Sequence, residues 1–213
     1  MKLAISSVAL MAGSAAAFGP FGAKAPAAST PVVKSFADDL VGALPPVGFW
    51  DPLGFAEKAN DSTLKRYREA ELTHGRVAML AVLGFLVGEK VEGNSFLFDA
   101  QVSGPAITHI GQVPEGFWAL LLLSIGAAEQ FRAEKGWVDP SEVPIDQPGL
   151  LRAEYVPGDL GFDPLGLKPE DPEEFREMQT KELQNGRLAM LAAAGFLAQE
   201  AADGKGIIEH FMS

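Results

Sequence analysis

Residues 71–89 read ELTHGRVAMLAVLGFLVGE and residues 182–200 read ELQNGRLAMLAAAGFLAQE, so that twelve of nineteen positions are identical. A similar phrase precedes each copy, GFWDPLGF at 48–55 and GFDPLGL at 161–167. Two long ungapped copies indicate one supersecondary unit used twice, because a solenoid needs three or more repeats. Each copy sets a Glu and an Arg at the edge of a run too apolar for a soluble surface helix. Such charges must be paired or coordinated, since an isolated charge in hydrocarbon costs several kcal/mol.

The composition of the 213-residue chain narrows the possible functions. No Cys is present, which excludes a disulfide framework, a thiolate zinc site and an iron–sulfur cluster. The net charge of −11 argues against a nucleic-acid partner, because phosphate binding needs a basic face. The hydrophobic content of 47% suits either an acidic soluble protein or a membrane protein, and its distribution along the chain favours the second.

The N-terminus is typical of a two-part targeting segment. Residues 1–17 combine a basic start, a short apolar stretch and small residues, as in a signal peptide. Residues 18–34 begin with Phe18 and contain no acidic residue, which is typical of a plastid transit segment. The order resembles presequences of proteins imported into complex plastids, where an ER signal ends at an Ala-Phe junction, and simple secretion is the alternative. Residues 35–213 then form the mature domain.

Three helical segments are predicted beyond the presequence, at about residues 63–89, 114–135 and 172–202. Asp61 or Ser62 is placed to cap the first segment, and Asp171 caps the third, with Pro172 at the first helical position. At 1.5 Å per residue, the first and third reach about 40 Å, enough to cross a ~30 Å hydrocarbon core. Their uninterrupted apolar runs are shorter than the ~18 residues usual for a span. The half that carries the Glu-containing motif must therefore also enter the bilayer.

The distribution of basic residues distinguishes a membrane protein from a soluble three-helix bundle. With three spans, the N-terminal segment from Lys34 on and the connection between the second and third helices share one side, which holds eleven Lys and Arg residues. The opposite side holds only Lys90 and Lys205. A soluble bundle has no reason to show such a positive-inside bias. The sequence therefore predicts an all-α membrane protein with three transmembrane helices and its N-terminus on the cis side, which is the stroma in a plastid.

The repeated motif places two polar side chains on one face of each helix. Glu71 and His74 are three residues apart, as are Glu182 and Asn185. The Arg five residues after each Glu lies about 140° further round the helix, so the two do not pair well within one helix. If the first and third helices cross about a pseudo-two-fold axis, the pairs form reciprocally and leave each carboxylate lone pairs for an electrophile. The predicted pairs are Glu71 with Arg187 and Glu182 with Arg76.

Two kinds of metal centre could use these lone pairs. Glu-x-x-His on a helix is half of a di-iron carboxylate site, but that site needs a second His where Asn185 stands, and the Arg residues would crowd a divalent ion. A metal inside an anionic macrocycle instead needs one axial lone pair, from imidazole, amide or a neutralised carboxylate, and the magnesium of chlorophyll fits this requirement. Glycines lack a side chain, so a flat pigment ring can lie close to the helix backbone. The same glycines would also permit close helix–helix packing without pigment. They are Gly75 and Gly84 in the first copy, and Gly186 and Gly195 in the second.

These motifs carry a family resemblance that covers residues 45–202. The two DPLG phrases, ExxHGRxAML and ExxNGRxAML occur in this order, and the chain resembles light-harvesting chlorophyll-binding proteins of the fucoxanthin chlorophyll a/c type. The resemblance implies a non-enzymatic antenna of the plastid thylakoid membrane that carries chlorophyll a, chlorophyll c and fucoxanthin or other carotenoids. It would pass excitation to photosystem I or II, and it would form homo- or hetero-oligomers with other antenna proteins.

The resemblance also implies roles for particular residues. The axial chlorophyll ligands would be Glu71, His74, Glu182, Asn185, Gln199, Glu129 and His210. The ion-pair partners would be Arg76, Arg187 and Arg132, and carotenoid end groups would lie at the loops of Asp51, Pro52, Asp163 and Pro164. Two positions break the pattern. Gly88 occupies the position in the first copy that is equivalent to Gln199 in the second. Leu121 stands where plant antennae carry a polar ligand.

Two other functions stay open from the sequence. A photoprotective relative would bind similar pigments and dissipate excitation as heat, and a membrane di-iron oxidase is the enzymatic alternative. Among the remaining polar residues, His109 is interpreted as a solvated or capping loop residue, and Trp118 and Trp137 as interfacial anchors. Asp203 and Glu209 fit a solvated face rather than a proton sensor.

Overall fold

The computed structural model describes residues 40–91, 102–143 and 149–212. The chain divides into two units, residues 1–33 and 34–213, and all described residues belong to the second unit. The predicted signal peptide (1–17) and transit segment (18–34) lie outside the described residues.

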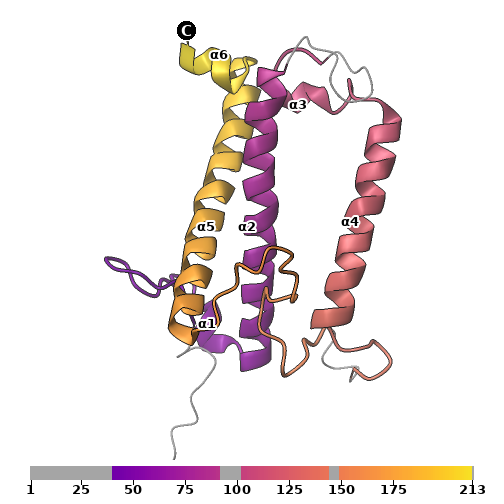
Figure 1. The fold of residues 1–213 in the computed structure, drawn as a ribbon. Coiled ribbons are helices and arrows are strands. Elements are labelled where there is room, and N and C mark those ends of the chain that lie inside the picture. Colours follow the sequence, from indigo (N-terminus) through magenta and orange to yellow (C-terminus); the bar gives the residue numbers. More distant parts are fainter. Residues whose placement is uncertain (1–39, 92–101, 144–148, 213) are drawn as a thin grey trace, which may run out of the picture. The chain divides into compact units, whose positions relative to one another are not determined.

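The described part of the chain contains three long helices and three short ones, joined by loops, and no strand. Their order along the chain is α1 (Phe55–Lys58), α2 (Asp61–Lys90), α3 (Ala106–His109), α4 (Glu115–Gly136), α5 (Pro172–Asp203) and α6 (Ile207–Met212). The long helices α2, α4 and α5 lie where the sequence predicts them, each within about two residues at either end, which is the usual uncertainty of a helix boundary. Figure 1 shows α3 and α6 at one end, here called the short-helix end, and α1 with its neighbouring loops at the other, the loop end.

The helix starts follow ordinary capping chemistry, with one correction to the sequence analysis. Asn60, and not Asp61 or Ser62, caps α2, because its side chain accepts a hydrogen bond from Thr63 N at 2.9 Å and its backbone is extended. The two predicted residues already lie beyond the cap. Asp171 caps α5 as predicted, by accepting from Glu174 N at 3.1 Å. An Asn or Asp oxygen that satisfies an open N–H of the first turn is worth about 1 kcal/mol.

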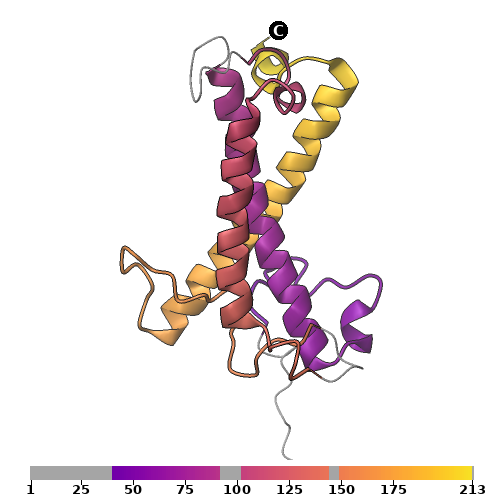
Figure 2. The ribbon, with the colours of Figure 1, turned by 90° about the vertical axis from the view of Figure 1, so that its right-hand side faces the viewer.

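The helices α2 and α5 cross at a pair of glycines. Figure 2 shows the crossing, and the glycines concerned are equivalent in the two sequence copies. A Cβ atom on Gly75 would lie 3.0 Å from the Cα atom of Gly186, and a Cβ on Gly186 would lie equally close to Gly75. The backbones therefore meet directly, as small residues permit. Buried apolar side chains surround the crossing: Leu72, Ala78, Leu183 and Ala189.

The helix α4 stands apart from this crossed pair (Figure 1). Its buried residue is Gly136 at its last position, while Leu122 and Leu123 are 72% and 71% exposed. Near the loop end, Arg132 Nη1 donates to Thr73 Oγ1 of α2 at 2.9 Å. The long apolar surface of α4 is thus left without protein cover in the described part of the chain, which indicates that other apolar material covers it.

The short helices are held by the opposite copy of the repeat. Glu89, the last residue of the first copy, accepts from Ile207 N and Ile208 N of α6, both at 2.7 Å. Glu200, the last residue of the second copy, accepts from Ile107 N of α3 at 2.8 Å. Each long helix therefore caps the short helix that follows the other one, and the reciprocal capping repeats the two-fold relation at this end.

Length and composition single out one described helix, α2, as able to cross a membrane. The same criterion is not met by α4 or α5, whose apolar stretches are flanked by polar residues such as Glu129 and Glu182. Membrane crossing by α4 and α5, which the sequence predicts, therefore stays a prediction.

Candidate functional site

Two reciprocal ion pairs flank the glycine crossing. Arg187 Nε donates to Glu71 Oε1 at 2.7 Å, and Arg76 Nε donates to Glu182 Oε1 at 2.7 Å. Each Arg also reaches a loop carbonyl at 2.8 Å, because Arg187 Nη1 donates to Gly42 O and Arg76 Nη2 donates to Gly158 O. Each guanidinium thus neutralises a carboxylate of the other helix and fastens a loop. The second oxygen of Glu71 lies 3.6 Å from Arg68 Nη1, a longer contact that leaves lone pairs for a further electrophile, and Arg76 contacts Glu182 through Oε1.

The side chains three residues after each Glu share a second arrangement. His74 Nδ1 lies 2.7 Å from Ala70 O, and Asn185 Nδ2 donates to Lys181 O at 2.8 Å. A carbonyl oxygen only accepts, so Nδ1 of His74 carries the proton and the ring lone pair is on Nε2. In the same way, the amide of Asn185 has its nitrogen engaged and its Oδ1 as the acceptor. Both residues are exposed. Imidazole and amide therefore present a neutral lone pair away from the helix axis.

This donor set suits a metal that already has four ligands. Within the described ranges, no group of three or more His, Asp or Glu side chains is placed to hold a metal ion together. A di-iron carboxylate centre needs such a group, so the described residues do not form that site. Single, separated axial donors beside neutralised carboxylates and exposed apolar surface instead match the magnesium of a flat macrocycle. The predicted ligands Glu71, His74, Glu182 and Asn185 fit that group.

The predicted ligand Gln199 lies at the short-helix end with two other polar groups. Gln199 Nε2 donates to Asp203 Oδ2, and His210 Nδ1 of α6 lies 2.9 Å from the same oxygen. In the first copy, Gly88 replaces the Gln because the His109 ring packs there. A Cβ on Gly88 would meet His109 Nδ1 at 3.3 Å. His109 Nε2 donates to Gly104 O at 2.8 Å, so this residue closes the α3 loop, in agreement with its interpretation as a capping histidine.

The predicted site on α4 combines Glu129 with Arg132. Arg132 Nε lies 3.5 Å from Glu129 Oε2 and 3.8 Å from Glu69 Oε1, so the Arg is shared between two carboxylates of different helices. Leu121 lines an almost wholly apolar cavity of about 670 Å³ between α2, α3 and α4. Its aliphatic side chain offers no lone pair, so it supplies no axial ligand at this position.

The two DPLG loops have the same internal hydrogen bonds. The Asp51 carboxylate accepts from Phe55 N and Ala56 N at 3.1 and 2.7 Å. The Asp163 carboxylate accepts from Leu167 N and Lys168 N at 3.0 and 2.8 Å. In the second loop, these backbone donors lower the pKa of Asp163. Both aspartates therefore close their own loops, and any contact of Asp51, Pro52, Asp163 or Pro164 with a carotenoid remains a prediction.

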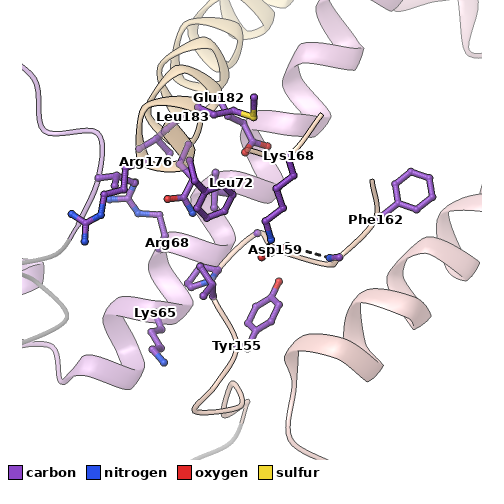
Figure 3. A pocket seen from close by; sticks show the side chains of 18 of the residues that line it. Lys65, Arg68, Leu72, Tyr155, Asp159, Phe162, Lys168, Arg176, Glu182 and Leu183 are labelled. Atoms are coloured by element: carbon purple, nitrogen blue, oxygen red, sulfur yellow. Dashed lines mark hydrogen bonds and ion pairs between the residues drawn. The ribbon is translucent and has the colours of Figure 1, made fainter. Parts of the chain in front are cut away.

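A cavity of about 790 Å³ lies between the loop around residues 153–168 and the helices α2 and α5. Figure 3 shows Glu182 and Leu183 on the α5 side, and Lys168 with Asp159 on the loop side. Lys168 Nζ donates to Asp159 Oδ2 at 2.6 Å. The Arg76–Glu182 pair forms part of its wall, so the cavity adjoins the predicted ligand Glu182.

A buried carboxylate that was not predicted from the sequence organises the same loop. Glu69, only 3% exposed, accepts from Tyr155 Oη at 3.0 Å and from Gly158 N at 2.8 Å, both through Oε2. Glu69 has no counterpart in the second copy, where Thr180 stands, so the repeat gave no signal for it. The end residues Glu89 and Glu200 were also missed, although their matching positions at the ends of the two copies are a usable signal.

The Tyr155–Glu69 hydrogen bond leads to a prediction about alkaline pH. Burial first, and then the charge of Glu69, raise the pKa of Tyr155 from 10 to about 12. A raised pKa means that the bond contributes its full stability below pH 10 and loses it as pH rises through about 12. We expect a late tyrosinate absorbance step that is missing in Tyr155→Phe and shifts to lower pH in Glu69→Gln. A wild-type titration with both tyrosines ionising near pH 10 would contradict the assignment.

Taken together, the glycine crossing, the neutralised carboxylates and the outward-facing imidazole and amide define a helical scaffold for metal-centred pigments. A family model described as "Chlorophyll A-B binding protein" matches residues 36–201. The chain belongs to this family of chlorophyll-binding light-harvesting proteins, whose members are not enzymes.

Relatives from two branches of the family are similarly close. A fucoxanthin-chlorophyll a-c binding protein of Isochrysis galbana is 54% identical over 171 residues, which cover 79% of this chain and 79% of the relative. Light-harvesting complex stress-related protein 1 of Chlamydomonas reinhardtii is 50% identical over 183 residues, or 84% of this chain and 71% of the relative. Chlorophyll a-b binding protein 6 of Arabidopsis thaliana is 36% identical over 76% of this chain and 64% of the relative.

Proposed function

We propose that this protein is a plastid antenna that binds chlorophyll a, chlorophyll c and fucoxanthin or related carotenoids and transfers excitation energy to a photosystem. The pigment set is that of the fucoxanthin-chlorophyll a-c binding protein of Isochrysis galbana, and the plastid location is that of the chloroplastic relatives. The observation that carries the proposal is the pair of equivalent donors His74 and Asn185. Each has its nitrogen hydrogen engaged by a carbonyl four residues earlier and its lone pair directed outward.

The protein's own part in this function is to fix positions and to tune the ligands. Glu71 and Glu182 act as axial ligands whose charge Arg187 and Arg76 cancel, so that no net charge is left among the pigments. His74 and Asn185 supply neutral ligands at matching positions on the two helices, and Gln199, Glu129 and His210 are further ligands. Bound chlorophyll would absorb light and hand the excitation to neighbouring pigments. Helix rigidity sets the distances over which that transfer occurs.

We propose that α2, α4 and α5 all cross the thylakoid membrane, with the loop end and the N-terminus on the stromal side. The excess of Lys and Arg on the loop-end side supports this orientation. The ion pairs Glu71–Arg187 and Glu182–Arg76 support insertion of α5 together with α2, because they remove the charges that would oppose it. Protease protection of tags at either end of the mature chain, in isolated thylakoids, tests the orientation.

We expect His74→Leu to remove one chlorophyll while the fold is retained, because imidazole here serves as a ligand and carries no ion pair. His74→Asn is the matched variant, since an amide stands at the equivalent Asn185, and it should keep the pigment. Reconstitution with pigments followed by chromatography gives the chlorophyll count per protein. An unchanged count in His74→Leu would show that His74 is only packed against the helix.

The photoprotective alternative is favoured by the stress-related relatives at about the same identity as the fucoxanthin-chlorophyll relative. Harvesting requires a long excited-state lifetime, whereas dissipation requires a short one under acid conditions. The purified pigment complex should therefore keep its fluorescence lifetime between neutral and acidic pH. A sharp shortening on acidification would assign the protein to the photoprotective branch while leaving its pigment sites in place.

Association with a photosystem and with other antenna subunits follows from the same proposal. The exposed apolar side chains of α4 are suited to contact lipid, pigment or a neighbouring membrane protein. Mild solubilisation of thylakoids and native gel electrophoresis should recover the chain in a particle larger than the monomer together with photosystem subunits. Recovery of the chain only as a monomer would contradict the proposed association with other subunits.

A further inference from the structure

A cluster of three polar side chains at the short-helix end points to a role for Asp203. Gln199 Nε2 donates to Asp203 Oδ2 one turn further along α5, and His210 Nδ1 of α6 lies 2.9 Å from the same oxygen. Gln199 Nε2 and His210 Nδ1 are 3.4 Å apart. One carboxylate oxygen therefore faces both a side-chain amide of its own helix and an imidazole of the next.

We propose that Asp203 is a positioning residue that holds the Gln199 amide with its carbonyl oxygen outward, as the axial ligand of a chlorophyll magnesium. The proposal rests on the proposed function, because it needs Gln199 to be a pigment ligand.

The orientation follows from hydrogen-bond chemistry. An ionised carboxylate only accepts, whereas an amide has a donating nitrogen and an accepting oxygen. The nitrogen of Gln199 must therefore face Asp203, since the reverse orientation would set two acceptors against each other. Oε1 then points the other way. In an amide, the oxygen carries the lone pair that binds a metal, so the orientation decides whether Gln199 can act as a ligand.

Two other predicted neutral ligands, His74 and Asn185, show the same arrangement with a different acceptor. His74 uses Ala70 O and Asn185 uses Lys181 O, in each case the carbonyl four residues earlier. Gln199 instead turns toward the carboxylate of Asp203, four residues later. All three ligands thus engage their N–H within the protein and leave an acceptor outward, which is how groups around a metal site usually fix the ligating atom.

An ordinary pair on the helix surface is the competing explanation, and the chain contains one for comparison. Gln130 Nε2 donates to Glu134 Oε1 at 2.9 Å on α4, also four residues apart, at residues for which no ligand role is predicted. If Asp203 only stabilises a helix, breaking either pair should have the same small effect on pigment content.

The test is reconstitution of the full chain with chlorophyll a and fucoxanthin, with chlorophyll per protein and the absorption difference spectrum as readouts. We expect Asp203→Ala to lose the same single chlorophyll as Gln199→Leu, with the same difference spectrum. The double variant Gln199→Leu with Asp203→Ala should lose no more than Gln199→Leu alone. Glu134→Ala should keep the full count.

Rescue separates a positioning role from a purely structural one. An imidazole can coordinate magnesium without a carboxylate to orient it, so Gln199→His in the Asp203→Ala background should restore the chlorophyll. Failure of that rescue, or a full pigment count in Asp203→Ala, would overturn the role of Asp203. A full count in Gln199→Leu would also overturn it while leaving the antenna function intact, whereas a wild-type chain that binds no chlorophyll would remove both proposals.

Discussion

Gly186→Leu is expected to abolish assembly of the pigment complex. A Cβ at this position would lie 3.0 Å from the Cα of Gly75, and this contact is backbone, which cannot turn aside as a side chain can. Even Gly186→Ala should cost about 1–3 kcal/mol through overpacking. Leu adds three more carbons at the same point and should force the helices apart. The ion pairs on both sides of the crossing would then lose their geometry.

The matched control for this prediction is Gly195→Leu on the same helix. A Cβ at Gly195 would meet no protein atom within 4 Å, so the helix crossing should survive. A loss of individual pigments is the most that this variant should show. Sedimentation of the refolded complexes on a sucrose gradient, with pigment counts of each band, separates the two outcomes. Equal assembly of both variants would mean that the glycine contact does not hold α2 and α5 together.

Arg187→Leu is the second change with a large expected effect. It leaves Glu71 without the guanidinium that lies 2.7 Å away, and it also removes the donor to Gly42 O. A buried ion pair broken on one side costs about 3–5 kcal/mol. In the proposed membrane-spanning arrangement, where only Arg68 Nη1 at 3.6 Å would remain beside Glu71, no stable complex should form. Glu71→Gln together with Arg187→Leu should partly rescue assembly, because the amide oxygen can still reach magnesium and needs no counter-charge.

An exposed ion pair on the same helix provides the control. Lys181 Nζ and Glu177 Oε1 lie 2.8 Å apart, and both side chains are largely exposed. Pairs of this kind are worth about 0–1 kcal/mol, so Lys181→Leu should assemble normally. If the Glu71→Gln and Arg187→Leu double variant assembles no better than Arg187→Leu, the pairing between α2 and α5 does not explain the loss.

The repeat predicted the reciprocal ion pairs on one condition. Equivalent Glu and Arg residues five positions apart do not pair well within one helix, so the pairs between helices were expected if the two copies cross about a two-fold axis. The structure contains both pairs at 2.7 Å. The small residues of the two copies likewise indicated close packing, although the sequence could not say that Gly75 and Gly186, rather than Gly84 and Gly195, form the contact.

Contacts between distant, unrepeated segments could not be predicted. Glu69 is indistinguishable in sequence from the exposed charges around it, and only the fold brings Tyr155 and Gly158 to its carboxylate. The N-cap of α2 was misplaced by one or two residues because Asn60, Asp61 and Ser62 are all good caps, and the choice depends on where the preceding loop becomes extended.

The sequence by itself determined the local and symmetric features: the three long helices, the motif faces and the ion pairs that neutralise the half-buried motif charges. These follow from helix periodicity and from the free-energy cost of an unpaired charge, which act wherever the chain folds. The tertiary structure alone decided the exceptions to the symmetry. It places His109 against Gly88 and Asp203 beside Gln199 and His210. Such contacts depend on how loops return to the helix ends, where no repeated pattern constrains the packing.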